Sequence, residues 1–314
     1  MPTAVAFPAS HIDLLDRPLT AALTTHLANG RLQSTVVWFW RDGGDVMLST
    51  MAEFYKARNL FARPLATLMV LEPDPAGRWI EVRGTVTRGH PDTADGRAAA
   101  LADLDAVSVR YCGVAPYFGR VVPADLAATE TPVTFRLKPT AAVVGPFPPR
   151  RPTGNAVAVP GHASLPDDAA PHAPDDVPLP ASHHDLFDRP LLAALSTRMP
   201  DGSAQTQPVW CGRDGDVVVL STTLERRKGR NLVADPRATV LVVDPADGGR
   251  WIEVRGDVEL VTAGAVEVLD ALTRAYTSKP AYYGHIAPAE FAGAETRVVV
   301  RLHPRRVNCD AIHR

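Results

Sequence analysis

The heptapeptide RWIEVRG stands at Arg78–Gly84 and again, unchanged, at Arg250–Gly256. Around it, Ser10–Gly84 aligns with Ser182–Gly256 without a gap, at a constant offset of 172 residues. Copy one begins SHIDLLDRP and copy two SHHDLFDRP, and KARNL in the first matches KGRNL in the second. Because solenoid units repeat about every 20–50 residues, a repeat of this length predicts a duplicated domain.

The match continues past the heptapeptide at a smaller offset. Copy one carries extra residues in the stretch GHPDTADGR, after which PYFG (Pro116–Gly119) aligns with AYYG (Ala281–Gly284). Residues 144–180, between the copies, are dominated by proline and short polar residues, which is typical of a semi-extended linker. The predicted organisation is a first domain at 1–143, a linker at 144–180 and a second domain at 181–314.

Apolar patterning and two Asp-Gly turn signals predict six strands in copy two. We expect them at Leu191–Thr197, Ala204–Trp210, Val217–Leu220, Ala238–Val243, Trp251–Val254 and Thr296–Leu302, with helices near Leu224–Ala234 and Gly264–Tyr276. Strands joined by consecutive hairpins favour a closed or nearly closed antiparallel barrel. The predicted fold class is mainly β with short helices (α+β), as two tandem six-stranded antiparallel barrels.

Composition narrows the class of protein. The 314 residues have a formal net charge of −2, which argues against the basic surface that nucleic acid or an anionic membrane requires. There is no signal-peptide pattern at the N-terminus and no apolar run long enough to span a membrane. Three cysteines without CxxC spacing exclude a disulfide framework and a cysteine zinc site. We therefore expect a cytoplasmic protein that binds neither nucleic acid nor a membrane and has no metal site.

Lysine is scarce, and its placement is informative. Only four of the 33 basic residues are lysine, and two of these, Lys56 and Lys228, occupy equivalent positions of the repeat. Each lies three residues before an asparagine, Asn59 or Asn231, so that lysine and asparagine share a helix face. A compact ammonium group that arginine does not replace explains the coincidence better than chance.

Each of these helical segments opens with Ser-Thr at a strand end, at Ser49-Thr50 and Ser221-Thr222. We expect Thr222 or Thr223 to cap the helix, where free N–H groups and the helix dipole favour an anion. With the lysine and a neighbouring arginine, this pattern predicts a phosphate or carboxylate site. The alternative interpretation is a solvated basic helix face.

Two strand patterns are also candidates for function. In RWIEVRG, Ile80 and Val82 share one face of the strand, which predicts a barrel core, while Trp79 shares the other face with a glutamate and an arginine. That second face fits a row of solvent-exposed side chains, a domain interface or one wall of a cofactor site. In copy two, Gln207-Pro208 places proline inside a strand, which indicates either a ligand-binding edge or an ordinary edge strand.

Several catalytic patterns are missing: there is no GxSxG, HExxH, Walker loop or strand-linked GxGxxG. An enzyme with this sequence would rely on a bound cofactor for its chemistry. The Asp-Gly hairpin, the Val-Trp strand, the segment ST-x(5)-K-x-x-N-L-x-x-x-P and RWIEVRG together resemble the pyridoxamine 5'-phosphate oxidase-like split β-barrel family. The resemblance covers both copies, and it is strongest to the flavin/deazaflavin oxidoreductase branch.

The resemblance implies a six-stranded split barrel that pairs with a second barrel, with cofactor sites between the two. Here the tandem copies would form an intramolecular pseudo-dimer, so we expect a monomer. The implied cofactor-binding residues of copy two are Ser221, Thr222, Arg226, Lys228 and Asn231 near the phosphate, and Gln207, Pro208, Trp210 and Trp251 near the ring. Copy one keeps Ser49, Thr50, Lys56, Asn59 and Trp79, but has Phe54 in place of Arg226 and Val36 in place of Pro208. These departures predict that one site is weakened or lost.

The implied activity is an oxidoreductase that transfers a hydride between the cofactor and a small organic substrate. Coenzyme F420 is the first choice of cofactor and FMN the second. A non-catalytic flavin- or haem-binding protein is the remaining alternative, because a fold does not fix a function.

Overall fold

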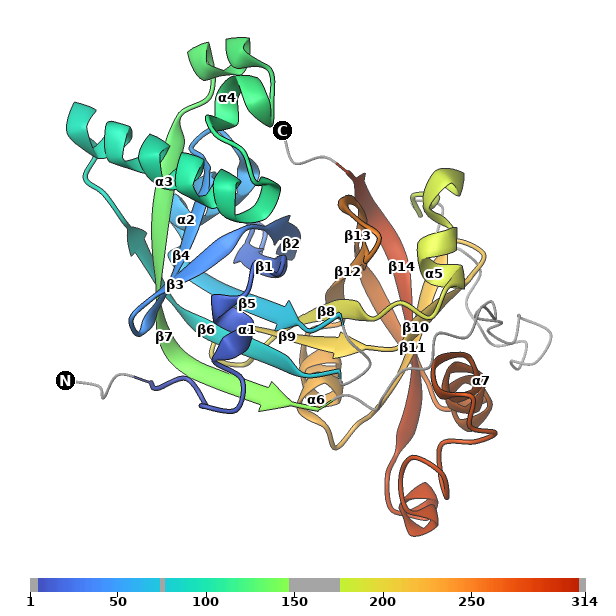
Figure 1. The fold of residues 1–314 in the computed structure, drawn as a ribbon. Coiled ribbons are helices and arrows are strands. Elements are labelled where there is room, and N and C mark those ends of the chain that lie inside the picture. Colours follow the sequence, from blue (N-terminus) through green and yellow to red (C-terminus); the bar gives the residue numbers. More distant parts are fainter. Residues whose placement is uncertain (1–4, 74–76, 147–175, 311–314) are drawn as a thin grey trace. The chain divides into compact units, whose positions relative to one another are not determined.

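The computed structural model describes residues 5–73, 77–146 and 176–310, which form two compact units (Figure 1). Unit 1 comprises residues 5–72 and 78–145, and the described part of unit 2 is mainly residues 176–310. Most of the predicted linker, residues 147–175, lies outside the described residues. The linker's predicted first residues, Val144 and Gly145, are instead the end of a strand that pairs with Ile80 and Trp79.

Unit 1 contains one sheet of seven antiparallel strands in the order β2-β1-β5-β6-β7-β4-β3. Its elements are α1 (Asp13–Asp16), β1 (Ala21–His26), β2 (Leu32–Val37), β3 (Phe39–Asp42), β4 (Asp45–Met51), α2 (Tyr55–Ala62), β5 (Leu65–Leu71), β6 (Trp79–Arg88), α3 (Ala94–Cys112), α4 (Tyr117–Arg120), the 3₁₀ turn η1 (Ala124–Ala128) and β7 (Pro132–Gly145).

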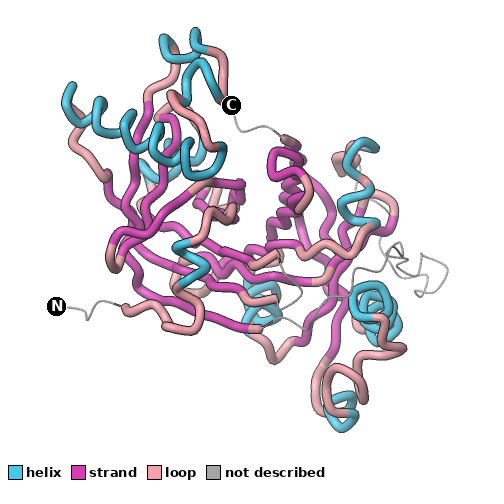
Figure 2. The backbone as a smooth tube through the Cα atoms, viewed as in Figure 1, coloured by secondary structure: helices cyan, strands magenta, loops and turns pink. Residues whose placement is uncertain are grey.

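Unit 2 repeats this plan, with the sheet order β9-β8-β12-β13-β14-β11-β10. Its elements are η3 (Ala181–His183), α5 (Asp185–Asp188), β8 (Ala193–Arg198), β9 (Ala204–Val209), β10 (Cys211–Asp214), β11 (Val217–Thr223), α6 (Arg227–Ala234), β12 (Arg237–Asp244), β13 (Asp247–Val261), α7 (Ala265–Thr277), η4 (Ala289–Gly293) and β14 (Arg297–Cys309). Figure 2 shows that strands make up most of each unit.

Each sheet curls until its edges meet, which confirms the predicted barrel. Strands β2 and β3 lie at opposite edges of the sheet, yet only Trp38 separates them along the chain. Trp210 likewise separates β9 from β10. Because one residue cannot span a flat seven-stranded sheet with strands about 4.8 Å apart, the two edges must be adjacent. Each sheet has seven strands rather than the predicted six because the chain breaks its ladder at this tryptophan and continues as a separate edge strand.

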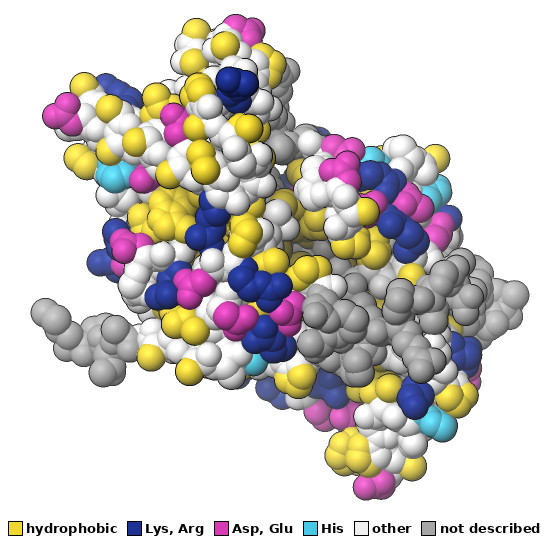
Figure 3. Space-filling view, in the orientation of Figure 1, with side chains coloured by type: hydrophobic (Ala, Val, Ile, Leu, Met, Phe, Trp, Pro, Cys, Tyr) yellow, Lys and Arg dark blue, Asp and Glu magenta, His cyan; other side chains and the backbone are white. Residues whose placement is uncertain are grey.

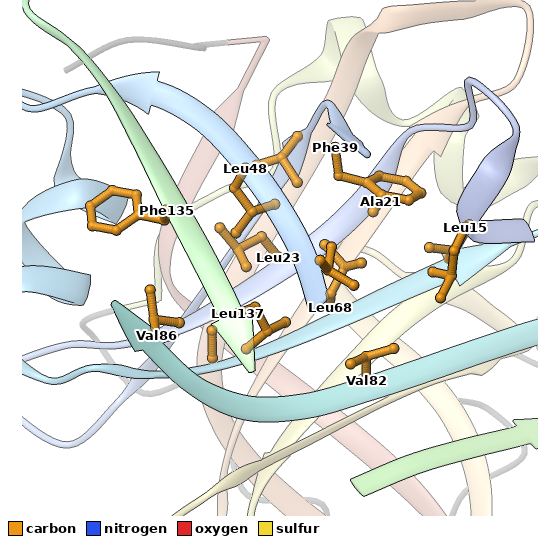
Figure 4. Close-up of a cluster of buried hydrophobic side chains, with 14 of the residues drawn as sticks. Leu15, Ala21, Leu23, Phe39, Leu48, Leu68, Val82, Val86, Phe135 and Leu137 are labelled. Atoms are coloured by element: carbon orange, nitrogen blue, oxygen red, sulfur yellow. The ribbon is translucent and has the colours of Figure 1, made fainter. Parts of the chain in front are cut away.

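The core of each unit fills the inside of the curled sheet. In unit 1 it includes Leu23, Leu68, Val82 and Leu137, all fully or almost fully buried (Figure 4). The aliphatic residues of both RWIEVRG strands lie in these cores, as the alternation predicted.

The glycine that ends RWIEVRG lies at a break in strand register. The pairing of β6 with β7 shifts between Arg83 and Gly84, and that of β13 with β14 shifts between Arg255 and Gly256. A Cβ on Gly256 would lie 2.0 Å from the carbonyl oxygen of His303, so no other residue fits without movement of the backbone.

Three of the charged residues that are identical in the two copies form ion pairs. Arg250 donates to Asp185 of the SHHDLFDRP motif at 2.5 Å and to Asp244 at 3.0 Å, and Arg189 of the same motif donates to Asp244 at 2.7 Å. Arg78 forms the matching contacts with Asp13 and Glu72 in unit 1. These contacts hold the short helix before β8, or before β1, against the sheet. The charged residues of SHHDLFDRP and the first arginine of RWIEVRG therefore stabilise the fold.

Candidate functional site

The predicted anion site lies where β11 ends and the chain turns toward α6. The helix begins at Arg227, with Arg226 as its N-cap and no side-chain cap. The prediction that Thr222 or Thr223 caps the helix is wrong, because both residues are still part of β11 and pair with β14. The intervening turn is held instead by Glu225, whose carboxylate accepts a hydrogen bond from the Thr296 backbone N–H at 3.0 Å. The backbone hydrogen bond from Thr296 is the largest cause that lowers the pKa of Glu225 to about 2, and side-chain hydrogen bonds with Thr296 and Thr223 contribute.

Buried hydroxyl groups without partners mark this strand end in both units. Thr222 Oγ1 is buried and has no hydrogen-bond partner among the described residues. Ser49 Oγ and Thr50 Oγ1 are in the same situation in unit 1. Thr50 and Thr222 are equivalent in the repeat. Because a buried polar group without a partner costs about 1–3 kcal/mol, the recurrence of this unpaired hydroxyl indicates a place for a hydrogen-bond acceptor. These residues fit the phosphate of a flavin or deazaflavin.

The hydroxyls of a Ser-Thr pair do not share one face. Side chains alternate along a strand, and Val218 and Leu220 fill the barrel core. Thr222 therefore points to the core side, whereas Ser221 and Thr223 point to the side on which α7 packs. Only one member of the pair can directly face a ligand bound on either side.

The two lysines have different surroundings. Lys228 is half-buried at the first turn of α6. Lys56 is only 6% exposed, and the described residues offer it neither a hydrogen bond nor an ion pair; its ammonium group lies 5.6 Å from the centre of the Phe54 ring. Burial lowers the pKa of Lys56 to about 8. A solvated basic helix face is therefore the wrong description of unit 1.

Arg226 and its counterpart Phe54 lie in different surroundings, one exposed and one buried. The Arg226 side chain is 48% exposed, and its guanidinium lies 3.9 Å from Glu295. Phe54 is buried in an apolar cluster with Met51, Leu104 and Tyr117.

The two asparagines hold the helix to the sheet. Asn231 Nδ2 donates to Thr197 Oγ1 at 3.0 Å and to Gln205 Oε1 at 3.1 Å. In unit 1, Asn59 makes the same pair of contacts, at 3.0 and 2.8 Å. Since both amide hydrogens are used, the asparagines fix the position of the lysine helix, and their donors are not available to a ligand.

Strand β9, with Gln207 and Pro208, lies at an edge of its sheet, where proline costs no ladder hydrogen bond on the open side. Trp210, which follows it, is buried and stacks on Tyr276, with ring centres 5.4 Å apart. The Tyr276 hydroxyl lies 2.6 Å from the Leu191 carbonyl oxygen and 2.9 Å from that of Cys211. Trp210 is thereby held where the two sheet edges meet.

The second face of RWIEVRG is not a row of solvent-exposed side chains. Trp251 is 2% exposed and Glu253 is fully buried. The Glu253 carboxylate accepts from Asn308 Nδ2 at 2.5 Å and lies 3.3 Å from Arg255 Nε. In unit 1, Trp79 is likewise buried, and a Cβ on Gly145 would lie 2.8 Å from its ring.

Sequence reasoning missed a polar cluster at the start of β14. Arg297 donates from Nη2 to the Tyr283 hydroxyl at 2.9 Å and to Glu295 at 3.0 Å, and it is 8% exposed. Tyr283 lies in the AYYG segment that aligned with PYFG, so the exchange of phenylalanine for tyrosine was a visible signal. The arginine was hidden because its counterpart in copy one is Pro132.

Charged residues of opposite sign are interspersed on the face of the molecule that Figure 3 shows. In the described parts of the chain, no three His, Cys, Asp or Glu side chains gather as a metal site would require. No helix within those parts is long and apolar enough to cross a membrane.

We compared the chain with known proteins and solved structures. No curated protein matches the chain. A solved structure named F420 reductase is 32% identical, with a TM-score of 0.37, over 41% of this chain and 98% of that one. The haem storage protein HutZ from Vibrio cholerae is 16% identical (TM-score 0.33; 45% and 95% covered). General Stress Protein 26 from Bacillus anthracis is 15% identical (TM-score 0.30; 40% and 88% covered).

The family model described as pyridoxamine 5'-phosphate oxidase matches twice, over residues 7–123 and 179–309. The two matches correspond to the two units and together cover most of the sequence. They also agree with the resemblance carried by the strand-end, lysine-helix and RWIEVRG motifs. The chain therefore belongs to the pyridoxamine 5'-phosphate oxidase family, with its characteristic domain present in two tandem copies.

Proposed function

We propose that the protein is an oxidoreductase that transfers a hydride between a bound deazaflavin, coenzyme F420, and a small organic substrate. FMN is the alternative cofactor in the same site. The observation that carries the proposal is the recurrence, in both units, of buried hydroxyls without partners at the strand end that precedes the lysine helix. Membership of the family supports a flavin-like ligand at this place.

The proposed phosphate ligands of unit 2 are the Thr222 hydroxyl, Lys228 and Arg226. Hydroxyl donors satisfy phosphate oxygens directly, and a half-buried ammonium group neutralises their charge in a medium less polar than water. Arg226 is exposed and held only loosely by Glu295, so it can turn toward an anion. Asn231 positions this set through Thr197 and Gln205.

The proposed ring-binding residues lie on the β9 edge. Gln207 and Pro208 present the open side of an edge strand, and Trp210 beside them is a large flat side chain held by Tyr276. When bound, the cofactor supplies the ring that accepts or donates the hydride. The protein orients that ring against the substrate and excludes water from it. No side chain of the chain is assigned a proton-transfer role.

Titration of the purified protein tests the proposal. We expect binding of F420, and a visible spectrum of the purified material with a deazaflavin or flavin band. Tight binding of FMN with no binding of F420 would contradict the first choice and support FMN. A haem Soret band, or no binding of either cofactor, would contradict the oxidoreductase proposal.

A further inference from the structure

Unit 2 contains a serine, a histidine and an aspartate that are hydrogen-bonded in a row, away from the residues proposed for the cofactor. Ser182 Oγ lies 2.9 Å from His183 Nδ1, and His183 Nε2 lies 3.0 Å from Asp310 Oδ2. Ser182 is exposed, whereas His183 is only 6% exposed. A hydroxyl, an imidazole and a carboxylate in this order are the groups that activate a serine nucleophile.

The carboxylate determines which ring nitrogen of His183 carries the proton. An ionised carboxylate only accepts hydrogen bonds, so His183 Nε2 donates to Asp310. In the neutral imidazole, Nδ1 is then an acceptor, and the Ser182 hydroxyl donates to it. His183 is therefore placed to take the Ser182 proton as a general base when Oγ attacks an electrophile.

The fold fixes both ends of this row. Asp310 Oδ1 accepts a hydrogen bond from the Trp251 N–H at 2.8 Å, and the Asp310 N–H donates to the Trp251 carbonyl oxygen at 3.1 Å. Ser182 lies in η3, and its carbonyl oxygen accepts a hydrogen bond from Arg250 Nη2 at 2.7 Å. Because these contacts already hold the serine and the carboxylate, the three groups need little rearrangement to react.

Unit 1 keeps the first two members of the row and lacks the third. Ser10 Oγ lies 2.8 Å from His11 Nδ1, but His11 Nε2 is buried and has no hydrogen-bond partner among the described residues. At the strand position of Asp310, unit 1 has Gly145. A Cβ on Gly145 would lie 2.8 Å from the Trp79 ring, which leaves no room for an aspartate unless the ring moves. The same chain therefore contains a serine–histidine pair without the carboxylate.

From this arrangement we propose that Ser182 is a nucleophile for acyl transfer, with His183 as its general base and Asp310 as the positioning residue that orients the imidazole. The substrate class is a small ester with a good leaving group, such as an aryl acetate. An exposed serine can reach a small acyl group, and a good leaving group requires less stabilisation of the tetrahedral intermediate. The inference is independent of the proposed function, because none of the three residues is assigned to the cofactor.

The proposed reaction has two steps. Ser182 Oγ bonds to the acyl carbon while its proton passes to His183 Nδ1, and the bond to the phenolate breaks as the phenolate takes that proton. Water then attacks the acyl carbon, and its proton passes to Nδ1 and on to Ser182 Oγ as the bond between Oγ and the acyl carbon breaks. The products are a carboxylic acid and a phenol, and the serine is regenerated.

A fluorophosphonate probe, which loses fluoride when a serine oxygen attacks its phosphorus, tests the inference on the full chain. Peptide mass spectrometry at successive times measures the labelling rate of each serine. We expect Ser182 to be labelled at least about tenfold faster than Ser10, which is its matched control in the same molecule. Equal rates at the two serines, or no labelling of Ser182, would overturn the inference.

Hydrolysis of 4-nitrophenyl acetate measures the proposed activity directly. Ser182→Ala should lower the rate of phenolate release at least about tenfold, whereas Ser10→Ala should leave it unchanged. Both substitutions remove one hydroxyl from an exposed residue, so they are matched in their effect on folding. A similar rate in the two variants would contradict a nucleophilic role of Ser182.

Asp310→Asn tests the positioning role. Asparagine keeps an oxygen for the Trp251 N–H, but its amide does not fix the tautomer of His183 as a carboxylate does. We expect the labelling of Ser182 to slow at least about tenfold. Nitrogen NMR of the His183 ring should show the form protonated at Nε2 in the original chain and a mixture of tautomers in the variant. An unchanged labelling rate, or an unchanged tautomer, would refute the role of Asp310.

Discussion

At the scale of single residues, Lys56 is the side chain whose placement has the clearest thermodynamic consequence. Its pKa is about 8 in the folded protein, against 10.5 for a lysine side chain in water, because burial disfavours the charged form. Between pH 8 and pH 10.5 the unfolded chain therefore binds more protons at this site than the folded chain. The free energy of unfolding should rise with pH across that interval, and below pH 8 the full penalty is present.

We expect Lys56→Met to raise the free energy of unfolding at pH 7 by about 2–3 kcal/mol in the ligand-free protein. The gain should shrink as pH rises from 8 to 10.5, as measured by urea denaturation at several pH values. Lys138→Met, at an exposed residue, is the matched control and should show no such dependence. A gain that stays constant up to pH 10.5 would show that Lys56 is charged at little cost.

The two lysines should differ in their effect on cofactor binding. Lys228→Ala is expected to weaken binding more than Lys56→Ala, because only unit 2 has an arginine two residues before the lysine, where unit 1 has Phe54. Fluorescence titration with the bound cofactor measures both losses. Equal losses would mean that the two sites are equivalent and that neither has been degraded.

The arginine-rich composition also has an explanation at this scale. Arg250 spans two carboxylates, Asp185 and Asp244, through separate nitrogens, a geometry that lysine cannot reproduce. We expect Arg250→Lys to lower the free energy of unfolding by about 1–2 kcal/mol, measured by chemical denaturation. Arg227→Lys, at an exposed arginine of the same unit, should change it by less than about 0.5 kcal/mol. A similar loss in both variants would refute the explanation.

At the scale of elements, the register shift in β13 depends on Gly256. Gly256→Ala places a methyl group 2.0 Å from a backbone oxygen of β14, so the strands must separate locally. We expect a loss of about 2–4 kcal/mol in thermal or chemical unfolding, within the range of overpacked sites. Gly293→Ala is the control, because nothing lies within 4 Å of a Cβ at that position. Equal stability of the two variants would mean that the bulge relaxes freely.

Local sequence patterns predicted that the helices exist but did not predict all of their ends. The stretch GHPDTADGR in copy one extends α3 to 19 residues, against 13 in α7. Thr93 caps α3 by accepting a hydrogen bond from the Gly96 N–H at 3.1 Å. The start of α6 was misplaced, because Thr222 and Thr223 favour a cap locally but are held in β11 by pairing with β14. Pairing between distant strands overrode the local preference.

At the scale of the whole molecule, the duplication predicts the oligomeric state. If the contact between two barrels is made within one chain, the protein should sediment as a monomer, or at most as a weak dimer. Analytical ultracentrifugation at several concentrations measures this. A stable dimer held through the Trp251 and Glu253 face would argue against an intramolecular pseudo-dimer.

The duplication, the antiparallel barrel and the presence of the lysine helix follow from the amino-acid sequence alone. Each of these depends on a pattern that recurs along the chain: a gapless repeat, apolar alternation, and Ser-Thr at a fixed distance from lysine. Core residues such as Ile80 and Val82 could be assigned because alternation alone places them on one face.

The tertiary structure was needed to show which identical residues are held by contacts within the fold. Arg250 and Asn231 find partners far along the chain, and Arg297 meets Thr223 through strand pairing. The structure also distinguishes Lys56 from Lys228, which are equivalent in the repeat: Lys56 is buried and Lys228 is half-buried. The physical reason is that burial and hydrogen bonding depend on residues that are far apart in the sequence. The folded sheet brings these residues together, and local sequence patterns do not reveal which of them will meet.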